Sequence, residues 1–147
     1  MFRSRRGSAI MEILISLGFI TFVLFFPIAM FSINHRQTAM STMLIHSLQI
    51  VSLHGGLPGE ARDIVLRNAE QLGFDPAEVS VNAEHNGVDL TNIRISKGNT
   101  EPIRVILQYP ADAEIRFLNN ILGAFGLQQA EDGYFVEIGY VHSEWVE

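Results

Sequence analysis

The feature that most constrains how this chain folds is a run of 21 residues without a charge, from Ile13 to Ile33. As an α-helix rising about 1.5 Å per residue, the run is about 31 Å long, which matches the hydrocarbon core of a bilayer. The apolar core of a secretory signal peptide is shorter, about 7–15 residues. We therefore predict a transmembrane helix over residues 13–33.

The charges around this run predict its orientation. Three arginines lie within the first six residues, whereas Arg36 is the first basic residue after the run apart from His35. Because positively charged flanks stay on the cytoplasmic side, the N-terminus is predicted inside the cell and the rest of the chain outside. Without residues 1–7 the chain has 7 basic and 16 acidic residues, a net charge of −9. An acidic body without a basic patch argues against nucleic acid as a partner.

A single carboxylate, Glu12, stands at the start of the apolar run, five residues after Gly7. A charged group at the mouth of a membrane helix costs free energy and usually has a function. The helix dipole stabilises a carboxylate near a helix N-terminus, and two opposite charges inside an apolar helix bundle are tolerable when they pair. Glu12 is therefore the first candidate for a functional residue.

The segment Arg-Arg-Gly-Ser-Ala-Ile-Met-Glu at residues 5–12, followed by an apolar helix, resembles the leader of the type IV prepilins. Within that superfamily, the Arg-Gly-Ser-Ala-x-x-Glu start resembles the TadE-like pilin-like proteins of tight-adherence systems. The resemblance implies that a prepilin peptidase cuts after Gly7 and that Ser8 becomes the first, often methylated, residue of the mature chain. It also implies that Glu12 meets the free amine of a neighbouring subunit during assembly.

A pilin-like protein of this kind is a structural subunit of a pilus or secretion filament. The resemblance implies a precursor held in the inner membrane with its C-terminal domain outside, and a cell-surface filament after assembly. The expected partners are the prepilin peptidase, other pilin-like subunits and the inner membrane. The chain departs from the pattern at Met11, where many such proteins have valine, and at its first proline, Pro27, fifteen residues after Glu12. Pro27 removes the backbone hydrogen bond to Val23 and is predicted to kink the helix.

Two other functions remain open on the sequence. The chain is either a permanently anchored extracytoplasmic domain that binds a partner without polymerising, or a secreted domain released by cleavage after the apolar run. An uncleaved N-terminus favours the first alternative, and a start beyond residue 33 favours the second.

Beyond the membrane segment, apolar residues at helical spacing from Ala39 to Leu53 continue the helix, and the paired glycines after His54 predict its end. A second helix is predicted from Leu57 to Gly73. Asn86-Gly87 is a strong hairpin signal. Four strands are predicted, at Val79–Ala83, Val88–Ser96, Ile103–Tyr109 and Tyr134–Trp145.

These elements predict an α+β fold. We expect a long, partly transmembrane N-terminal helix packed on a small antiparallel sheet with one or two additional helices. The expected division is a prepilin leader at 1–7, the long N-terminal helix at 8–53, and a small extracytoplasmic α+β domain at 54–147.

The segment 115–127 lies between the last two predicted strands and carries seven large apolar residues. One interpretation is a core helix that crosses the sheet. The other is an apolar contact surface for a neighbouring subunit or the membrane. The residues expected in such a contact are Phe117, Leu118, Ile121, Leu122 and Phe125.

The sequence shows no pattern typical of an enzyme. The absence of cysteine excludes disulfides, thiolate catalysis and zinc–thiolate sites. The five histidines lack metal-ligand spacing, and no nucleophile elbow, phosphate loop or dinucleotide fingerprint occurs. We therefore predict a protein that is not an enzyme, with no catalytic, cofactor-binding or metal-binding residues.

Overall fold

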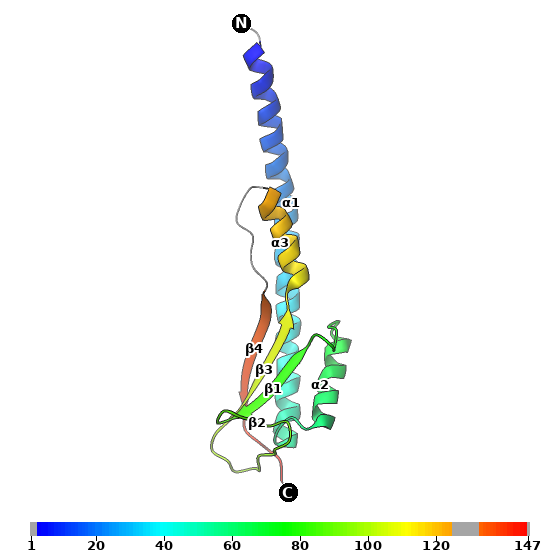
Figure 1. Cartoon of the computed structure of the whole chain (residues 1–147), viewed down its shortest axis with the longest axis vertical. Coiled ribbons are helices and arrows are strands. Elements are labelled where there is room, and N and C mark those ends of the chain that lie inside the picture. The colour runs from blue at the N-terminus through cyan, green and yellow to red at the C-terminus, as the bar shows by residue number, and fades with distance from the viewer. Residues whose placement is uncertain (1–2, 125–132, 147) are drawn as a thin grey trace. The chain divides into compact units, whose positions relative to one another are not determined.

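The computed structural model of the protein describes residues 3–124 and 133–146. Its longest element is α1 (Arg3–His54), a single helix of 52 residues (Figure 1). Hydroxyl groups along α1 bond back to the preceding turn, as Thr21 Oγ1 does to the Leu17 carbonyl at 2.9 Å. These bonds explain how polar side chains are accommodated within so apolar a helix.

Helix α2 (Gly59–Gln71) follows α1 after a short connection. Pro58, with φ −62°, precedes the first turn of α2. At this position the backbone N–H has no partner within the helix, so proline, which lacks an N–H, removes no helical hydrogen bond. Ala61, Val65 and Ala69 are four residues apart and buried, so they form a single stripe that faces the core. Helix α3 (Asp112–Ala124) follows β3 and precedes β4 in the sequence.

The four strands form one antiparallel sheet in the order β2-β1-β3-β4 (Figure 1). The hairpin between the first two strands turns through Asn86 and Gly87, at φ 51° and 77°, the positive values that a tight two-residue hairpin requires. The strand bounds are β1 (Ser80–His85), β2 (Val88–Asp89), β3 (Ile103–Pro110) and β4 (Tyr134–Val141).

The core lies between one face of this sheet and the C-terminal part of α1 together with α2. Alternate residues of β1 and β3 are buried, as expected for a sheet that packs on one face. The largest fully buried side chains are Met40, Met43 and Val51 of α1, Val65 of α2, Ile103, Val105 and Leu107 of β3, and Leu57 and Leu90 of the connections. The predicted α+β class and the predicted packing of the long helix on a small antiparallel sheet are confirmed.

Strand β4 packs directly on α1. A Cβ added at Gly139 would lie 2.8 Å from Leu48 Cδ1, so the leucine side chain would have to shift to make room for a larger residue on the strand. Ser41 Oγ donates a hydrogen bond to Glu137 Oε1 at 3.0 Å. The other side of the strand presents Tyr134, Val136, Ile138 and Tyr140, which we call the open face of β4.

The chain divides into two compact units. One contains residues 1–35 and 113–130, and the other contains residues 36–112 and 131–147. Helix α1 therefore contributes its first part to one unit and residues 36–54 to the other. The sheet, α2 and the core belong to the second unit, which we call the sheet unit.

The predicted strand Val88–Ser96 is wrong beyond Asp89. The Asp89 carboxylate accepts hydrogen bonds from both the Thr91 backbone N–H at 3.0 Å and the Thr91 hydroxyl at 2.7 Å, which turns the chain out of the sheet. The residues that follow pair with the end of α1 instead, through the bond from Ile95 N–H to the Gly55 carbonyl at 2.7 Å. The last predicted strand likewise ends at Val141, four residues early.

Arg36 begins the sheet unit and lies over two aromatic rings. Its guanidinium carbon is 5.9 Å from the Phe74 ring centroid and 5.5 Å from that of Tyr109. The two rings meet edge to face, with centroids 4.8 Å apart. The cation–π contacts therefore connect α1 to the loop after α2 and to β3.

We expect Arg36→Ala to lower the free energy of unfolding of the sheet unit by about 1–2 kcal/mol, the range for partly desolvated cation–π contacts. Urea unfolding of the full chain in detergent micelles measures this loss. The matched control is Arg62→Ala, an exposed position on α2, for which the change is expected to stay within about 0.5 kcal/mol. Equal losses in the two variants would contradict a specific role for the ring contacts.

Candidate functional site

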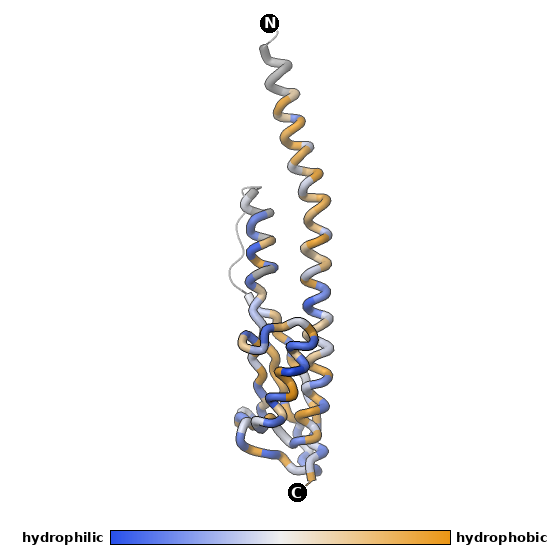
Figure 2. The backbone as a smooth tube through the Cα atoms, turned by 90° about the vertical axis from the view of Figure 1, so that its right-hand side faces the viewer, coloured by the Kyte–Doolittle hydropathy of each residue, from blue (hydrophilic) through white to orange (hydrophobic). Residues whose placement is uncertain are grey.

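The N-terminal part of α1 exposes an almost continuous apolar surface. Ile13 is 66% exposed and Phe31 is 73% exposed. Between residues 9 and 35, Ala29 is the single buried residue that the structure describes. Figure 2 shows the hydrophobic colour extending along this part of the helix. A helix that is apolar all round is stable only inside lipid or among other apolar helices.

The length and composition of this helix suffice for crossing a membrane. An apolar segment with a mean hydropathy of 2.5 lies within Ala9–His54, and only 6% of that segment is buried. The predicted transmembrane segment at residues 13–33 lies within α1. The helix is thus a candidate membrane anchor.

Glu12 lies on the exposed surface of α1, in an open hollow of about 350 Å³. The other residues that line this hollow are Ala9, Ile13, Ser16, Leu17 and Ile20. The carboxylate has no hydrogen-bond or ion-pair partner among the residues that the structure describes. A carboxylate with apolar neighbours is costly to bury alone, so a bundle or membrane that covers this surface favours a cationic partner for it.

Gly7 and Ser8 also lie on α1, and the structure describes their backbone but not their surroundings. In a helix, Ser8 and Glu12 are four residues apart, so they share a face at a separation of about 6 Å along the axis. Pro27 lies inside α1, and the helix continues on both sides of it. The cleavage after Gly7 and the kink at Pro27 remain predictions.

The predicted helix around residue 117 forms as α3, and its residues cluster with the N-terminal part of α1. Phe117 is partly buried, whereas Leu118, Ile121 and Leu122 are described by their backbone alone. Phe125 lies outside the described residues. Among the described residues, the core of the sheet unit contains none from α3. Both interpretations of this segment, a core helix that crosses the sheet and an apolar contact surface, therefore remain predictions.

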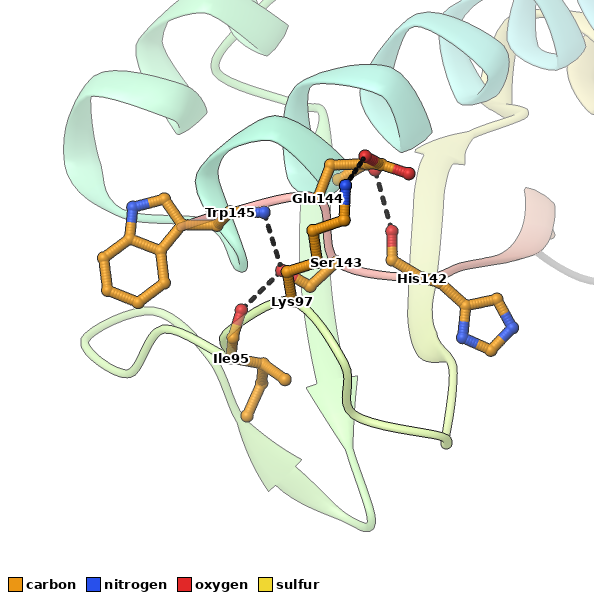
Figure 3. A network of polar contacts seen from close by, with 7 residues as sticks. Ile95, Lys97, His142, Ser143, Glu144 and Trp145 are labelled. Carbon is orange, nitrogen blue, oxygen red and sulfur yellow. Dashed lines mark hydrogen bonds and ion pairs between the residues drawn. The ribbon is translucent and has the colours of Figure 1, made fainter. Parts of the chain in front are cut away.

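A cluster of contacts that no sequence pattern predicts lies near the C-terminus, and we call it the C-terminal clasp (Figure 3). Ser143 Oγ donates a hydrogen bond to the Ile95 carbonyl and accepts one from Trp145 N–H at 3.1 Å. Lys97 Nζ lies 3.1 Å from Glu144 Oε2. These contacts connect the tail after β4 to the loop at residues 90–98.

The same tail contacts the end of α1. Ser52 Oγ donates to the His142 carbonyl at 2.7 Å, and the Ser52 carbonyl accepts from Glu144 N–H at 2.8 Å. A Cβ on Gly55 would lie 2.5 Å from the Ile95 carbonyl oxygen and 3.0 Å from Trp145 Cβ. Three segments that are far apart in the sequence therefore meet at Gly55.

A second hollow, of about 460 Å³, lies between α1 and β4 in the sheet unit. Its lining is Ile45, Leu48, Gln49, Ser52 and Leu53 of α1 and Val141 of β4. We call it the edge hollow. The sequence does not predict this hollow, because Val141 lies beside α1 only once the sheet has formed in its observed register.

Among residues 3–124 and 133–146, no three histidine, aspartate or glutamate side chains form a group suited to a metal ion. His85, the buried histidine of β1, has its Nε2 3.2 Å from the Asn99 side-chain amide. That contact fits a structural role in holding the loop at residues 98–101.

Comparison of the chain with family models, curated proteins and solved structures gave no match. A function for the chain therefore has to be argued from its own residues. The features available for that argument are the apolar helix with Glu12, the edge hollow and the open face of β4.

Proposed function

We propose that the protein is a pilin-like structural subunit of a type IV or tight-adherence-type pilus or secretion filament, made as a prepilin. The observation that carries this proposal is the exposed apolar surface of α1 with one carboxylate, Glu12, in its hollow, for which the described residues offer no partner. A membrane anchor alone needs the apolar surface but has no use for the carboxylate. A subunit whose leader is cleaved after Gly7 requires both the apolar surface and the carboxylate, because its new N-terminal amine can pair with Glu12.

In the proposed mechanism, the inner membrane holds the precursor through α1, and a prepilin peptidase removes residues 1–7. The new amine at Ser8 is a cation at the very start of the helix. Paired with Glu12 of a neighbouring subunit, it removes the cost of two isolated charges in an apolar bundle. The exposed apolar side chains of α1 supply most of the packing between subunits, which we infer to be other pilin-like chains.

The first test is leader processing. Intact mass and N-terminal sequencing of the protein from membranes that contain a prepilin peptidase are expected to show a chain that begins at Ser8 and carries one methyl group. A Gly7→Leu variant, with a bulky residue at the cleavage position, is expected to keep its leader. Retention of Met1 or Phe2 in the unmodified protein would contradict prepilin processing, and a start beyond residue 33 would indicate a secreted domain.

A second candidate function is a permanently anchored domain that binds a partner without polymerising. The specific observation in its favour is the apolar surface of the sheet unit, where Leu53 is 65% exposed beside the edge hollow. This candidate predicts an intact N-terminus. It also predicts that changes at Glu12 leave the protein's assemblies unaltered.

A further inference from the structure

The outer edge of β4 is open in the described part of the structure. The strand is eight residues long and pairs with β3 on one side, and none of its backbone groups bonds to another described segment. In an antiparallel pair, half of the N–H and C=O groups of an edge strand point away from its neighbour. Such an edge is a template for a further strand.

Natural sheets protect such edges with lysine, proline, bulges or inward-pointing charges. Of these devices β4 has one, since its single charged residue, Glu137, points inward to α1 and accepts the bond from Ser41, but the strand has no lysine and no proline. Its open face is apolar at alternate positions. Tyr134 is 67% exposed, and Tyr140 is 63% exposed.

The edge hollow adds a second apolar surface at the same place. Val141, the last residue of β4, is its only β-strand residue, and no residue of β3 lines it, so the hollow adjoins the end of the edge strand. Ile45 and Leu53, which line it from α1, are 56% and 65% exposed. A strand added beside β4 would thus extend the open face with one set of side chains and rest on α1 with the other.

We propose that the outer edge of β4 receives an extended segment of another polypeptide as a fifth strand of the sheet. The backbone of that segment satisfies the open N–H and C=O groups, and its alternate apolar side chains fill the edge hollow and cover the open face. This inference goes beyond the proposed function, and its peptide-binding test is independent of leader processing.

The net charge of the sheet unit indicates which residues the added segment carries at its two ends. Residues 36–112 and 131–147 carry 6 basic and 14 acidic residues, a net charge of −8. None of the residues that line the edge hollow or form the open face of β4 is charged. The segment is therefore uncharged where it pairs and carries lysine or arginine at its ends, where the field of the unit attracts cations.

A second copy of this chain does not fit the site. Ser41 contacts Glu137 and Ser52 contacts His142, so β4 and α1 run in the same direction. Antiparallel pairing of two β4 strands would point residues 36–54 of the two copies in opposite directions, whereas the filament proposed above joins the N-terminal ends of neighbouring helices. This reason against a second copy therefore rests on the proposed function. Two units of charge −8 also repel each other.

The test uses the full chain in detergent micelles and a fluorescent peptide that alternates valine or isoleucine with threonine between paired terminal lysines. Fluorescence anisotropy is expected to show saturable binding. Hydrogen exchange is expected to show new protection of β4 amides. A peptide of identical sequence, N-methylated at alternate amides, is expected not to bind, because it cannot complete the ladder of hydrogen bonds.

Ile138→Lys, on the open face, and Leu53→Lys, in the edge hollow, are each expected to weaken binding by roughly tenfold or more. The matched control is Val88→Lys, which adds the same charge at the opposite edge of the sheet, where Val88 is 51% exposed. Its affinity is expected to match that of the unmodified protein. All three positions are exposed, so circular dichroism is expected to show unchanged folding.

Three results would overturn the proposal. They are no binding by the unmodified protein, equal binding of the N-methylated peptide, and equal loss of affinity in the Val88→Lys control. A fourth is a doubling of the particle mass with concentration that Ile138→Lys abolishes, since this would identify a second copy as the occupant.

Discussion

Gly55→Ala is expected to lower the free energy of unfolding of the sheet unit by about 3 kcal/mol or more. Gly55 has φ +67°, and holding alanine there costs about 1 kcal/mol. The new Cβ would also lie 2.5 Å from the Ile95 carbonyl oxygen, a backbone atom that cannot rotate away. Overpacking of this kind costs about 1–3 kcal/mol, because the C-terminal clasp must move as a whole.

Urea unfolding of the full chain, followed by the fluorescence of Trp145, measures this loss at the affected site. Trp145 is the only tryptophan, and its Cβ lies next to Gly55. The matched control is Gly73→Ala, at φ +84° but with no atom within 4 Å of the added Cβ. It is expected to cost about 1 kcal/mol from backbone conformation alone. Equal costs at the two positions would contradict the close approach at Gly55.

Glu12→Gln is expected to abolish filament assembly while leaving membrane insertion and leader processing intact. Glutamine keeps the shape of the side chain but cannot neutralise the amine of a neighbouring subunit. Breaking a buried ion pair by removing one partner costs about 3–5 kcal/mol, and about 1.4 kcal/mol corresponds to a factor of ten. The assembled fraction is therefore expected to fall by about two orders of magnitude or more.

The measurement compares sheared filaments with the processed subunit that remains in the membrane, both quantified by immunoblot. Ser16→Ala is the matched control, since Ser16 lines the same hollow without carrying a charge. Its filament yield is expected to equal that of the unmodified protein. Unchanged filament yield in Glu12→Gln would favour the permanently anchored domain.

Local patterns predicted much of the fold. Each helix was predicted from residues within it or next to its ends. These are the apolar spacing of residues 39–53 and the paired glycines after His54 for α1, and the proline at position 58 for α2. The alternation of β4 was also visible, because a strand repeats its pattern every second residue.

The parts that sequence did not predict depend on contacts between distant segments. Residues 90–96 have the apolar content of a strand, but the Asp89 carboxylate and the carbonyl of Gly55 draw them out of the sheet. The association of α3 with the N-terminal part of α1 likewise depends on tertiary packing. An apolar segment between two strands has no local feature that specifies which element it joins.

The candidate sites divide in the same way. Glu12 and Gly7 were identified from the spacing of residues at the N-terminus, since their chemistry depends on neighbours along the chain. The edge hollow required the position of Val141 beside α1, and the open edge of β4 required the strand order. Neither the edge hollow nor the open edge of β4 is formed by residues that are neighbours in the sequence, so no local pattern predicts them.

The C-terminal clasp has a consequence for the order of biosynthesis. The bond from Ser52 to His142 joins residues 90 positions apart, and the bond from Ser41 to Glu137 joins residues 96 apart. Residues 41–52 therefore leave the ribosome before their partners at 137–142 have been made. The sheet unit completes its fold only after residues 137–144 have left the ribosome, and in an exported chain only after they have been translocated. Until then, the apolar side of residues 36–54 is available to chaperones and proteases.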